Sequence, residues 1–174
     1  MSGWRDATRI GAGKKAGRLD RRMNEGYGDM TDRYLEPTQA SGAALMARAI
    51  PGEVVMLNLL RFREVADYSA SPELATSAGI SGREAFQKYI DHTLPILRAS
   101  GGDLDFLGEG GKYLIGPQEE RWDLVMLVRQ KSLAEFMAFA TNEVFLTSLG
   151  HRTAALEESR LLPLVAYDGT NITG

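Results

Sequence analysis

Two short apolar segments constrain the fold of this 174-residue chain more than any other feature. Residues 53–62 read EVVMLNLLRF and residues 122–128 read WDLVMLV, so each segment is apolar at successive positions rather than at alternate ones. Successive side chains of a strand point to opposite faces, and a strand that is apolar on both faces belongs at the centre of a sheet covered on both sides. Both segments are therefore predicted to be central strands of one sheet.

Helices and further strands are predicted around these two segments from capping residues and helical spacing. Residues 67–81 are rich in small residues and form a loop long enough to act as a lid. The pairs Glu119-Glu120 and Glu157-Glu158 are interpreted as solvated surface, the second at a helix end. The other predicted elements are a short helix at about 39–49, a capped helix from Ser81 to Gly101, a strand at 103–116, a helix after Ser132, a helical stretch after Asn142 and a last strand at 161–167.

The predicted order after the first short helix is strand, helix, strand, strand, helix, strand. This is the ferredoxin-like split βαβ pattern of the α+β class, and its two central strands would be the two segments that are apolar on both faces. The protein's own helices would cover one face of the sheet. The other face needs a cover, so we predict a homodimer that pairs sheet to sheet.

Charge divides the chain into a basic head and an acidic body. Residues 1–30 carry seven Lys and Arg against four Asp and Glu, whereas residues 31–174 carry thirteen against nineteen. We predict a basic, flexible extension at 1–29, one domain at 30–167 and a tail at 168–174. An acidic body argues against nucleic acid as a partner.

Several classes of site and location are disfavoured by composition. The chain has no cysteine, which excludes disulfides and thiolate metal sites and suits a cytoplasmic protein. No apolar run is long enough to span a membrane, so no membrane partner is predicted. No metal or other cofactor is predicted, because the histidines lack a ligand spacing, the GAGKK stretch at 11–15 fails the P-loop pattern, and no glycine-rich dinucleotide turn follows a strand.

Arg152 is the least expected residue of the stretch 145–156. Projected as a helix, it falls in the middle of an apolar stripe, while His151 lies on the flank at the edge of a pocket or in water. An inward guanidinium keeps its charge and needs a partner. The alternatives are a structural salt bridge to Asp123 or Glu109 and an anchor for the carboxylate or enolate of a substrate.

Four further residues are candidates for the same site. Asn58 is the polar residue of the first strand's apolar run, and it either reaches a pocket or bonds nearby backbone. Trp122 either lines a cavity with its indole N–H or packs at its rim. Asp123 is a general base if burial raises its pKa. His92 is either the acid/base group or a boundary residue that bonds the carbonyl freed by Pro95.

Four segments together resemble a known family: EVVMLNLLRF, GREAFQKYI before a glycine pair, ERWDLVMLV and HRTAALEESRL. They look like the bacterial proteins grouped as domain of unknown function 1330, in the dimeric α/β-barrel superfamily, over about residues 30–164. The resemblance implies a ferredoxin-like protomer and a dimeric α/β barrel with a cavity between sheet and helices, but no reaction. Family members often have Tyr-Pro-Ser where this chain has Gln130-Lys131-Ser132. This departure affects the expected geometry of the local turn and not the expected fold. Superfamily relatives include cofactor-free monooxygenases, muconolactone isomerases and decarboxylase-like enzymes.

These observations lead to two functional hypotheses. The first is a protein that binds a small organic carboxylate or enolisable carbonyl compound, with cofactor-independent acid/base chemistry of the isomerase or monooxygenase kind. In it His92 or Asp123 would move the proton. The second is a non-catalytic dimeric module for ligand binding, structure or regulation. The residues expected to bind the substrate in the first hypothesis are Arg152, Asn58, Trp122 and His151.

Overall fold

The computed structural model describes residues 34–167 and 169, which belong to one compact unit, Arg33–Gly174. The predicted extension at 1–29 lies outside the described residues, and of the predicted tail at 168–174 only residue 169 is described. Within the described part of the chain, no helix is both long and apolar enough to cross a membrane.

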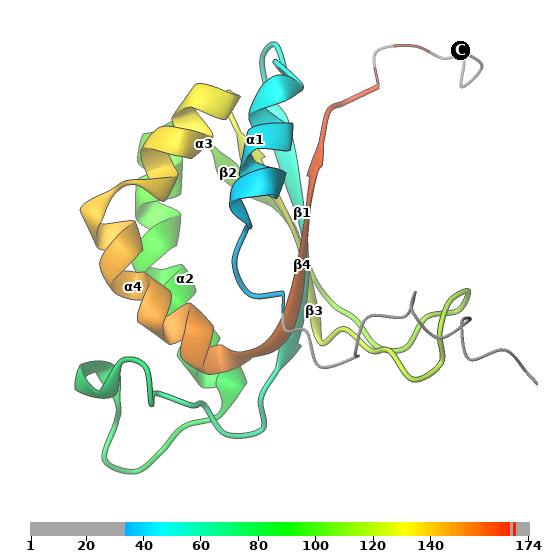
Figure 1. Ribbon diagram of the computed structural model, residues 1–174. Helices are drawn as coiled ribbons and strands as arrows, with labels where there is room; N and C mark the ends of the chain where they lie inside the picture. Colours follow the sequence, from blue (N-terminus) through cyan, green and yellow to red (C-terminus); the bar gives the residue numbers. More distant parts are fainter. Residues whose placement is uncertain (1–33, 168, 170–174) are drawn as a thin grey trace, which may run out of the picture. The chain divides into compact units, whose positions relative to one another are not determined.

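Four antiparallel strands form one sheet in the order β2-β3-β1-β4 (Figure 1). With a helical connection after β1 and another after β3, this order is the ferredoxin-like topology, and it confirms the predicted α+β fold class with β1 and β3 at the centre. The elements are α1 (Gln39–Ala47), β1 (Val54–Phe62), the 3₁₀ turn η1 (Pro72–Leu74), α2 (Gly82–Ala99), β2 (Asp103–Glu109), β3 (Leu124–Gln130), α3 (Leu133–Ala140), α4 (Glu143–Ala155) and β4 (Leu156–Leu164).

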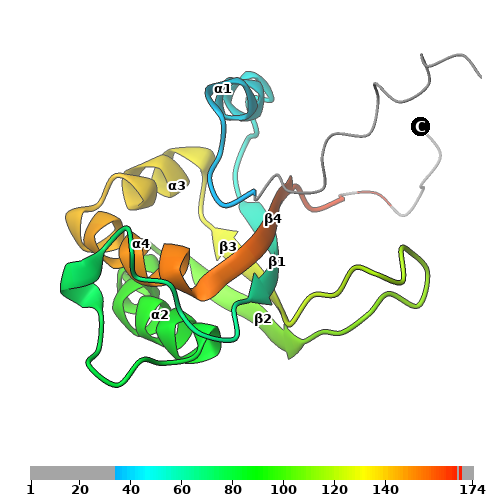
Figure 2. The same cartoon turned by 60° about the horizontal axis from the view of Figure 1, so that its bottom comes forward.

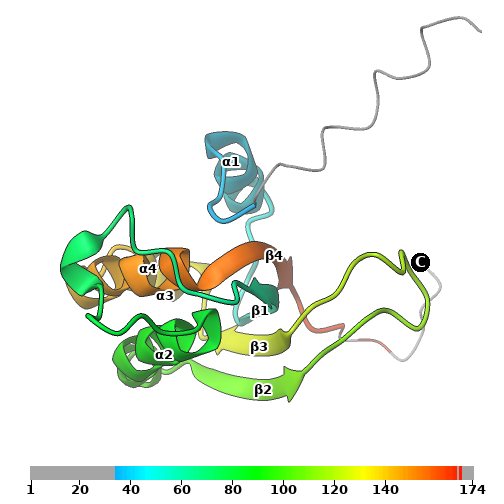
Figure 3. The ribbon, with the colours of Figure 1, turned by 90° about the horizontal axis from the view of Figure 1, so that it is seen from below.

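The inner face of the sheet carries the core. In Figures 1 and 3, α2, α3 and α4 all lie on one side of the sheet. Alternate residues of β1 and β3 point to that side and are buried beneath the helices. There the ring of Phe86 from α2 packs against that of Phe62, with centroids 5.4 Å apart and planes tilted by 49°. The buried core cluster consists of Leu60, Phe62, Ala85, Phe86, Leu124, Met126, Ala155 and Leu156.

The outer face of the sheet is also apolar. Register pairs Leu57 with Leu127 and Leu59 with Val125, so these side chains share the face opposite the buried residues. All four are half-buried, and Leu162, which pairs with Leu57 on the other side, is 53% exposed. No described helix covers this face (Figures 1 and 3).

The last strand differs from the sequence prediction. β4 begins at Leu156, immediately after α4, rather than near residue 161. Glu157 and Glu158 therefore lie in a strand and not at a helix end, and both pair with Arg61 of β1, at 3.3 Å and 3.1 Å. The strand lies at the edge of the sheet, where charged residues are tolerated. Because its first residues are acidic and continue the helical spacing of α4, the sequence predicted a helix there and not a strand.

The close packing of the start of α2 against neighbouring backbone can be tested at Gly82, its first residue. A Cβ placed there would lie 2.5 Å from both the Ala155 and the Arg63 carbonyl oxygens, which are backbone atoms that cannot turn away. We expect Gly82→Ala to lower the free energy of unfolding by about 1–3 kcal/mol, measured by urea unfolding. Gly42→Ala in α1 is the matched control: nothing lies within 4 Å of its Cβ, so it should be neutral or slightly stabilising. Equal effects of both changes would contradict this packing.

Candidate functional site

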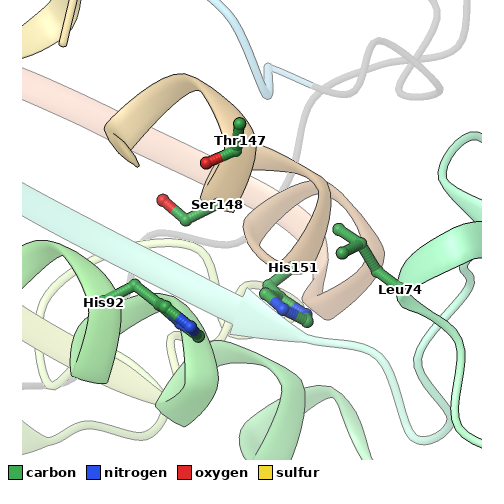
Figure 4. A pocket seen from close by; sticks show the side chains of 5 residues that line it. All are labelled: Leu74, His92, Thr147, Ser148 and His151. Atoms are coloured by element: carbon green, nitrogen blue, oxygen red, sulfur yellow. The ribbon is translucent and has the colours of Figure 1, made fainter. Parts of the chain in front are cut away.

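A pocket of about 150 Å³ opens among α2, α4 and the loop that contains η1. Figure 4 shows its lining side chains. Two of them are the chain's two histidines, which lie 59 positions apart in the sequence and come from different helices. The lining residues are Leu74, His92, Thr147, Ser148 and His151.

His151 forms the buried part of this pocket. It is only 8% exposed, and its Nδ1 lies 2.8 Å from the hydroxyl of Tyr68, whose ring meets the imidazole edge to face. Tyr68 comes from the loop after β1, which passes along α4 and α2 in Figure 2. The loop can approach α4 because residue 150 is glycine: a Cβ there would lie 2.5 Å from Leu74 and 2.7 Å from the Ser71 hydroxyl.

His92 forms the exposed side of the pocket. Its ring stacks on that of His151, with centroids 5.8 Å apart and planes 15° apart. Its Nδ1 lies 2.6 Å from the Lys88 carbonyl oxygen, one helical turn earlier, rather than at the carbonyl that Pro95 was expected to free. A carbonyl oxygen only accepts, so Nδ1 carries the hydrogen and Nε2 of the neutral ring keeps its lone pair.

The surroundings separate the acid/base properties of these groups. The pKa of His151 lies below its ordinary value, first because the ring is buried, then because of the charges of His92 and Lys88. Burial raises the pKa of Tyr68, so its phenol stays protonated near neutral pH. The rings lie close enough for a positive charge on one imidazole to disfavour a charge on the other.

The other polar lining groups are hydroxyls. Ser148 Oγ donates to the Phe145 carbonyl at 2.7 Å, and Thr147 Oγ1 donates to the Val144 carbonyl at 3.1 Å. Both oxygens therefore face a ligand as acceptors only. No group of three or more His, Asp or Glu side chains that could hold a metal ion occurs among the described residues.

Arg152 points inward, but its partners are not the expected carboxylates. Its Nη1 donates to the Leu35 carbonyl at 2.6 Å and its Nη2 to the Ser159 hydroxyl at 3.3 Å. Burial lowers the pKa of the guanidinium, while the Tyr89 and Glu36 side chains act in the opposite direction.

The predicted salt bridge of Arg152 to Asp123 or Glu109 is therefore wrong. Those carboxylates pair elsewhere, Asp123 with Arg121 and Glu109 with Arg83, each at 3.3 Å.

The remaining predicted site residues lie away from the pocket lining. Asn58 Nδ2 donates to the Met56 carbonyl at 3.0 Å, so of its two predicted alternatives the structure has the bond to nearby backbone. Trp122 is 4% exposed, and its indole N–H donates to the Tyr113 hydroxyl at 2.6 Å. Asp123 accepts the Phe62 backbone N–H at 2.8 Å and so joins two strand ends.

The structure thus brings His92 and His151 together and adds Tyr68, which sequence reasoning missed. The available signal was a tyrosine within the proposed lid loop at 67–81.

Arg152 can be tested as a structural residue. Arg152→Met leaves the Leu35 carbonyl without its donor, so we expect the free energy of unfolding to fall by about 1–3 kcal/mol in urea. Arg48→Met is the matched control, because Arg48 donates to the Pro163 carbonyl from an exposed position, and its change should stay within about 0.5 kcal/mol. Unchanged stability of Arg152→Met would mean that the arginine serves a ligand instead.

The burial of His151 predicts an acid-sensitive fold. Unfolded His151 takes up a proton below its ordinary pKa of about 6.5, whereas the folded ring takes it up only at lower pH. The free energy of unfolding should therefore fall as pH drops below about 6.5, and less so in His151→Gln. Urea unfolding at a series of pH values measures both slopes. His92→Gln should retain most of the pH dependence, because burial lowers the pKa of His151 more than the charge of His92 does. Equal slopes in wild type and His151→Gln would refute the assignment of the pH dependence to His151.

Comparison with known proteins finds no matching family model and no matching curated protein. The methylated RPA0582 protein is 31% identical, with a TM-score of 0.71 over 80% of this chain and 98% of that chain. A second structure of RPA0582, a protein of unknown function from Rhodopseudomonas palustris, is 31% identical, with a TM-score of 0.69 over 79% of this chain and 100% of that one. A hydroxynitrile lyase from Passiflora edulis is 12% identical with a TM-score of 0.44 over 70% of this chain and 100% of that one, too remote a likeness to bear on function.

The likeness to RPA0582 covers almost the whole of that protein at 31% identity. The chain belongs to the family of the Rhodopseudomonas palustris protein RPA0582.

Proposed function

We propose that the chain binds a small organic molecule in the His92–His151 pocket and transfers a proton on it without a cofactor. The observation that carries the proposal is the array of Tyr68, His151 and His92: two stacked imidazoles with different surroundings, one of them held by a phenol, on the wall of a pocket. The reaction class is abstraction and return of a proton next to a carbonyl, as in an isomerisation.

His151 is the general base of this proposal. When its Nδ1–H donates to the Tyr68 oxygen, Nε2 presents a lone pair, and the lowered pKa keeps that lone pair free near neutral pH. His92 is the conjugate partner, since its fixed Nδ1–H leaves Nε2 as the site that gains or gives a proton. In the working state His151 accepts a proton at Nε2 and His92 gives one from Nε2, so that a base and an acid act on the same ligand.

The size and charge of the pocket indicate the ligand class. A cavity of 150 Å³ holds benzene in an engineered protein, so the ligand has roughly six to ten non-hydrogen atoms. The positive charge of Lys88, which acts on His151, would stabilise a carboxylate or a developing enolate. Lys88 thus takes the anion-binding role first expected of Arg152, whose Nη1 and Nη2 both donate within the protein.

We also propose that the protein is a homodimer paired through the outer sheet face, which completes the dimeric α/β barrel. Two observations support the pairing: the apolar outer residues of β1 and β3 lack a described cover, and the four quoted segments resemble the domain of unknown function 1330 family. Face-to-face pairing would remove that apolar surface from water. A cytoplasmic location stays our prediction from the lack of cysteine.

A second candidate is a non-catalytic ligand-binding module. The specific observation in its favour is that two expected substrate contacts, Arg152 and Asn58, and the expected base Asp123 all bond to the protein itself. In this alternative the two histidines bind a ligand but transfer no proton.

Deuterium exchange separates the two candidates. A panel of small keto acids and 1,3-dicarbonyl compounds in D₂O would be followed by ¹H NMR for loss of the α-proton, while the imidazole C–H signals report binding. We expect catalysed exchange that falls by about 10²–10⁴-fold in His151→Gln. Asp91→Asn, which changes the Gln87–Asp91 pair on α2, is the matched control and should exchange at the wild-type rate.

Binding without exchange by any compound of the panel would favour the non-catalytic module. If no compound of the panel bound or exchanged, that result would refute the pocket as a site.

A further inference from the structure

Residues 110–121, here called the arm, connect β2 to β3 and stand out from the sheet. In Figures 1 and 3 the arm extends on the side away from the helix layer, which is the side of the outer sheet face. Two neighbouring aliphatic residues in the arm are almost fully exposed, Leu114 at 97% and Ile115 at 91%. Side chains of this kind are normally buried, so two such residues together on a projection point to a partner.

The arm is held in place by bonds of its own. Its root is closed by a bridge between Lys112 and Arg121. The hydroxyl of Tyr113 accepts the indole N–H of Trp122 at 2.6 Å. Gln118 donates to the carbonyls of Tyr113 and Gly116, at 3.1 Å and 3.2 Å. The aliphatic pair is therefore presented by an ordered segment, and little conformational entropy is lost when it docks.

The arm is continuous with the outer sheet face. It lies between the end of β2 and the start of β3. The guanidinium of Arg160, which shares the face of Leu59, lies 5.2 Å from the ring centre of Trp122 at the arm's root. Phe106 of β2 adds a ring that is 51% exposed. Whatever covers the outer face would also lie beside the arm.

We propose that the arm clasps a second copy of this chain, which is bound to the outer sheet face. Leu114 and Ile115 of each copy would pack against the apolar surface of the other copy. The inference rests on the sheet-to-sheet dimer proposed above and adds the arm to its contact surface. A two-fold axis would place one arm on each side of the paired sheets, because a symmetric interface uses the same patch twice.

The charges of the arm favour a protein partner over a lipid surface. Lys112 and Arg121 are balanced by Glu119 and Glu120, so the arm has no net positive charge with which to bind anionic headgroups. The partner's surface must instead be apolar and of matching extent, which the outer face of an identical chain supplies.

Sedimentation equilibrium over a concentration series tests the clasp with three double or single variants of the full chain. We expect wild type to be a dimer and Leu114→Ser/Ile115→Ser to dissociate at least about 100-fold more readily, given the apolar area of the two side chains. Val65→Ser/Val144→Ser is the matched control, because these valines are exposed elsewhere, at 65% and 47%. Leu162→Lys on the outer face tests the sheet pairing separately.

The absence of cysteine allows a second measurement that does not depend on the serine variants. A single Leu114→Cys should react with a maleimide at least about tenfold more slowly at dimer-forming concentrations than at high dilution. Val65→Cys should react at one rate throughout.

A wild-type dimer whose dissociation constant is unchanged by the serine pair, with Leu114→Cys equally reactive at all concentrations, would overturn the clasp and leave the sheet-paired dimer standing. A wild-type monomer at all concentrations would overturn both, without touching the ligand pocket. Loss of dimer in the serine pair but not in Leu162→Lys would refute sheet pairing and overturn the clasp on the outer face, because the arm would then hold a dimer of another geometry. Pelleting of wild type with neutral and anionic lipid vesicles, lost in the serine pair, would assign the arm to a membrane instead and overturn the clasp.

Discussion

The pairing of β1 with β3 is the constraint on which the rest of the structure depends. Their register sets Leu57 opposite Leu127 on the outer face, and it places Met56 and Leu60 on the buried face with Met126 and Leu124. Since side chains alternate along a strand, one register determines both the core beneath the helices and the apolar surface that remains outside. A slip by one residue would exchange the two.

The site is a consequence of how closely α2 and α4 pack on that sheet. Gly82 lets the start of α2 meet the Ala155 and Arg63 carbonyls, and Gly150 lets the η1 loop lie on α4. These two contacts bring His92 and His151 to stacking distance and place Tyr68 on the buried imidazole. His92 is exposed and His151 is buried, and the different roles proposed for them rest on that difference.

Arg152 illustrates where reasoning from the sequence succeeded and where it stopped. Helical spacing correctly placed its guanidinium toward the interior, since periodicity depends only on the positions of neighbouring residues. Its partner was assumed to be a carboxylate, whereas the structure provides the Leu35 carbonyl and the Ser159 hydroxyl. A guanidinium has five donors, and carbonyl dipoles can satisfy them without a second charge.

The sequence by itself determined the fold class, the two central strands and the inward position of Arg152, because hydrophobic spacing and capping are local properties of the chain. Only the tertiary structure decided that β4 starts at Leu156, and that His92, His151 and Tyr68 meet while Asn58, Trp122 and Asp123 do not join them. Contacts between residues far apart in the sequence depend on how helices pack and where loops lie. Those arrangements follow from the whole core, and no single segment encodes them.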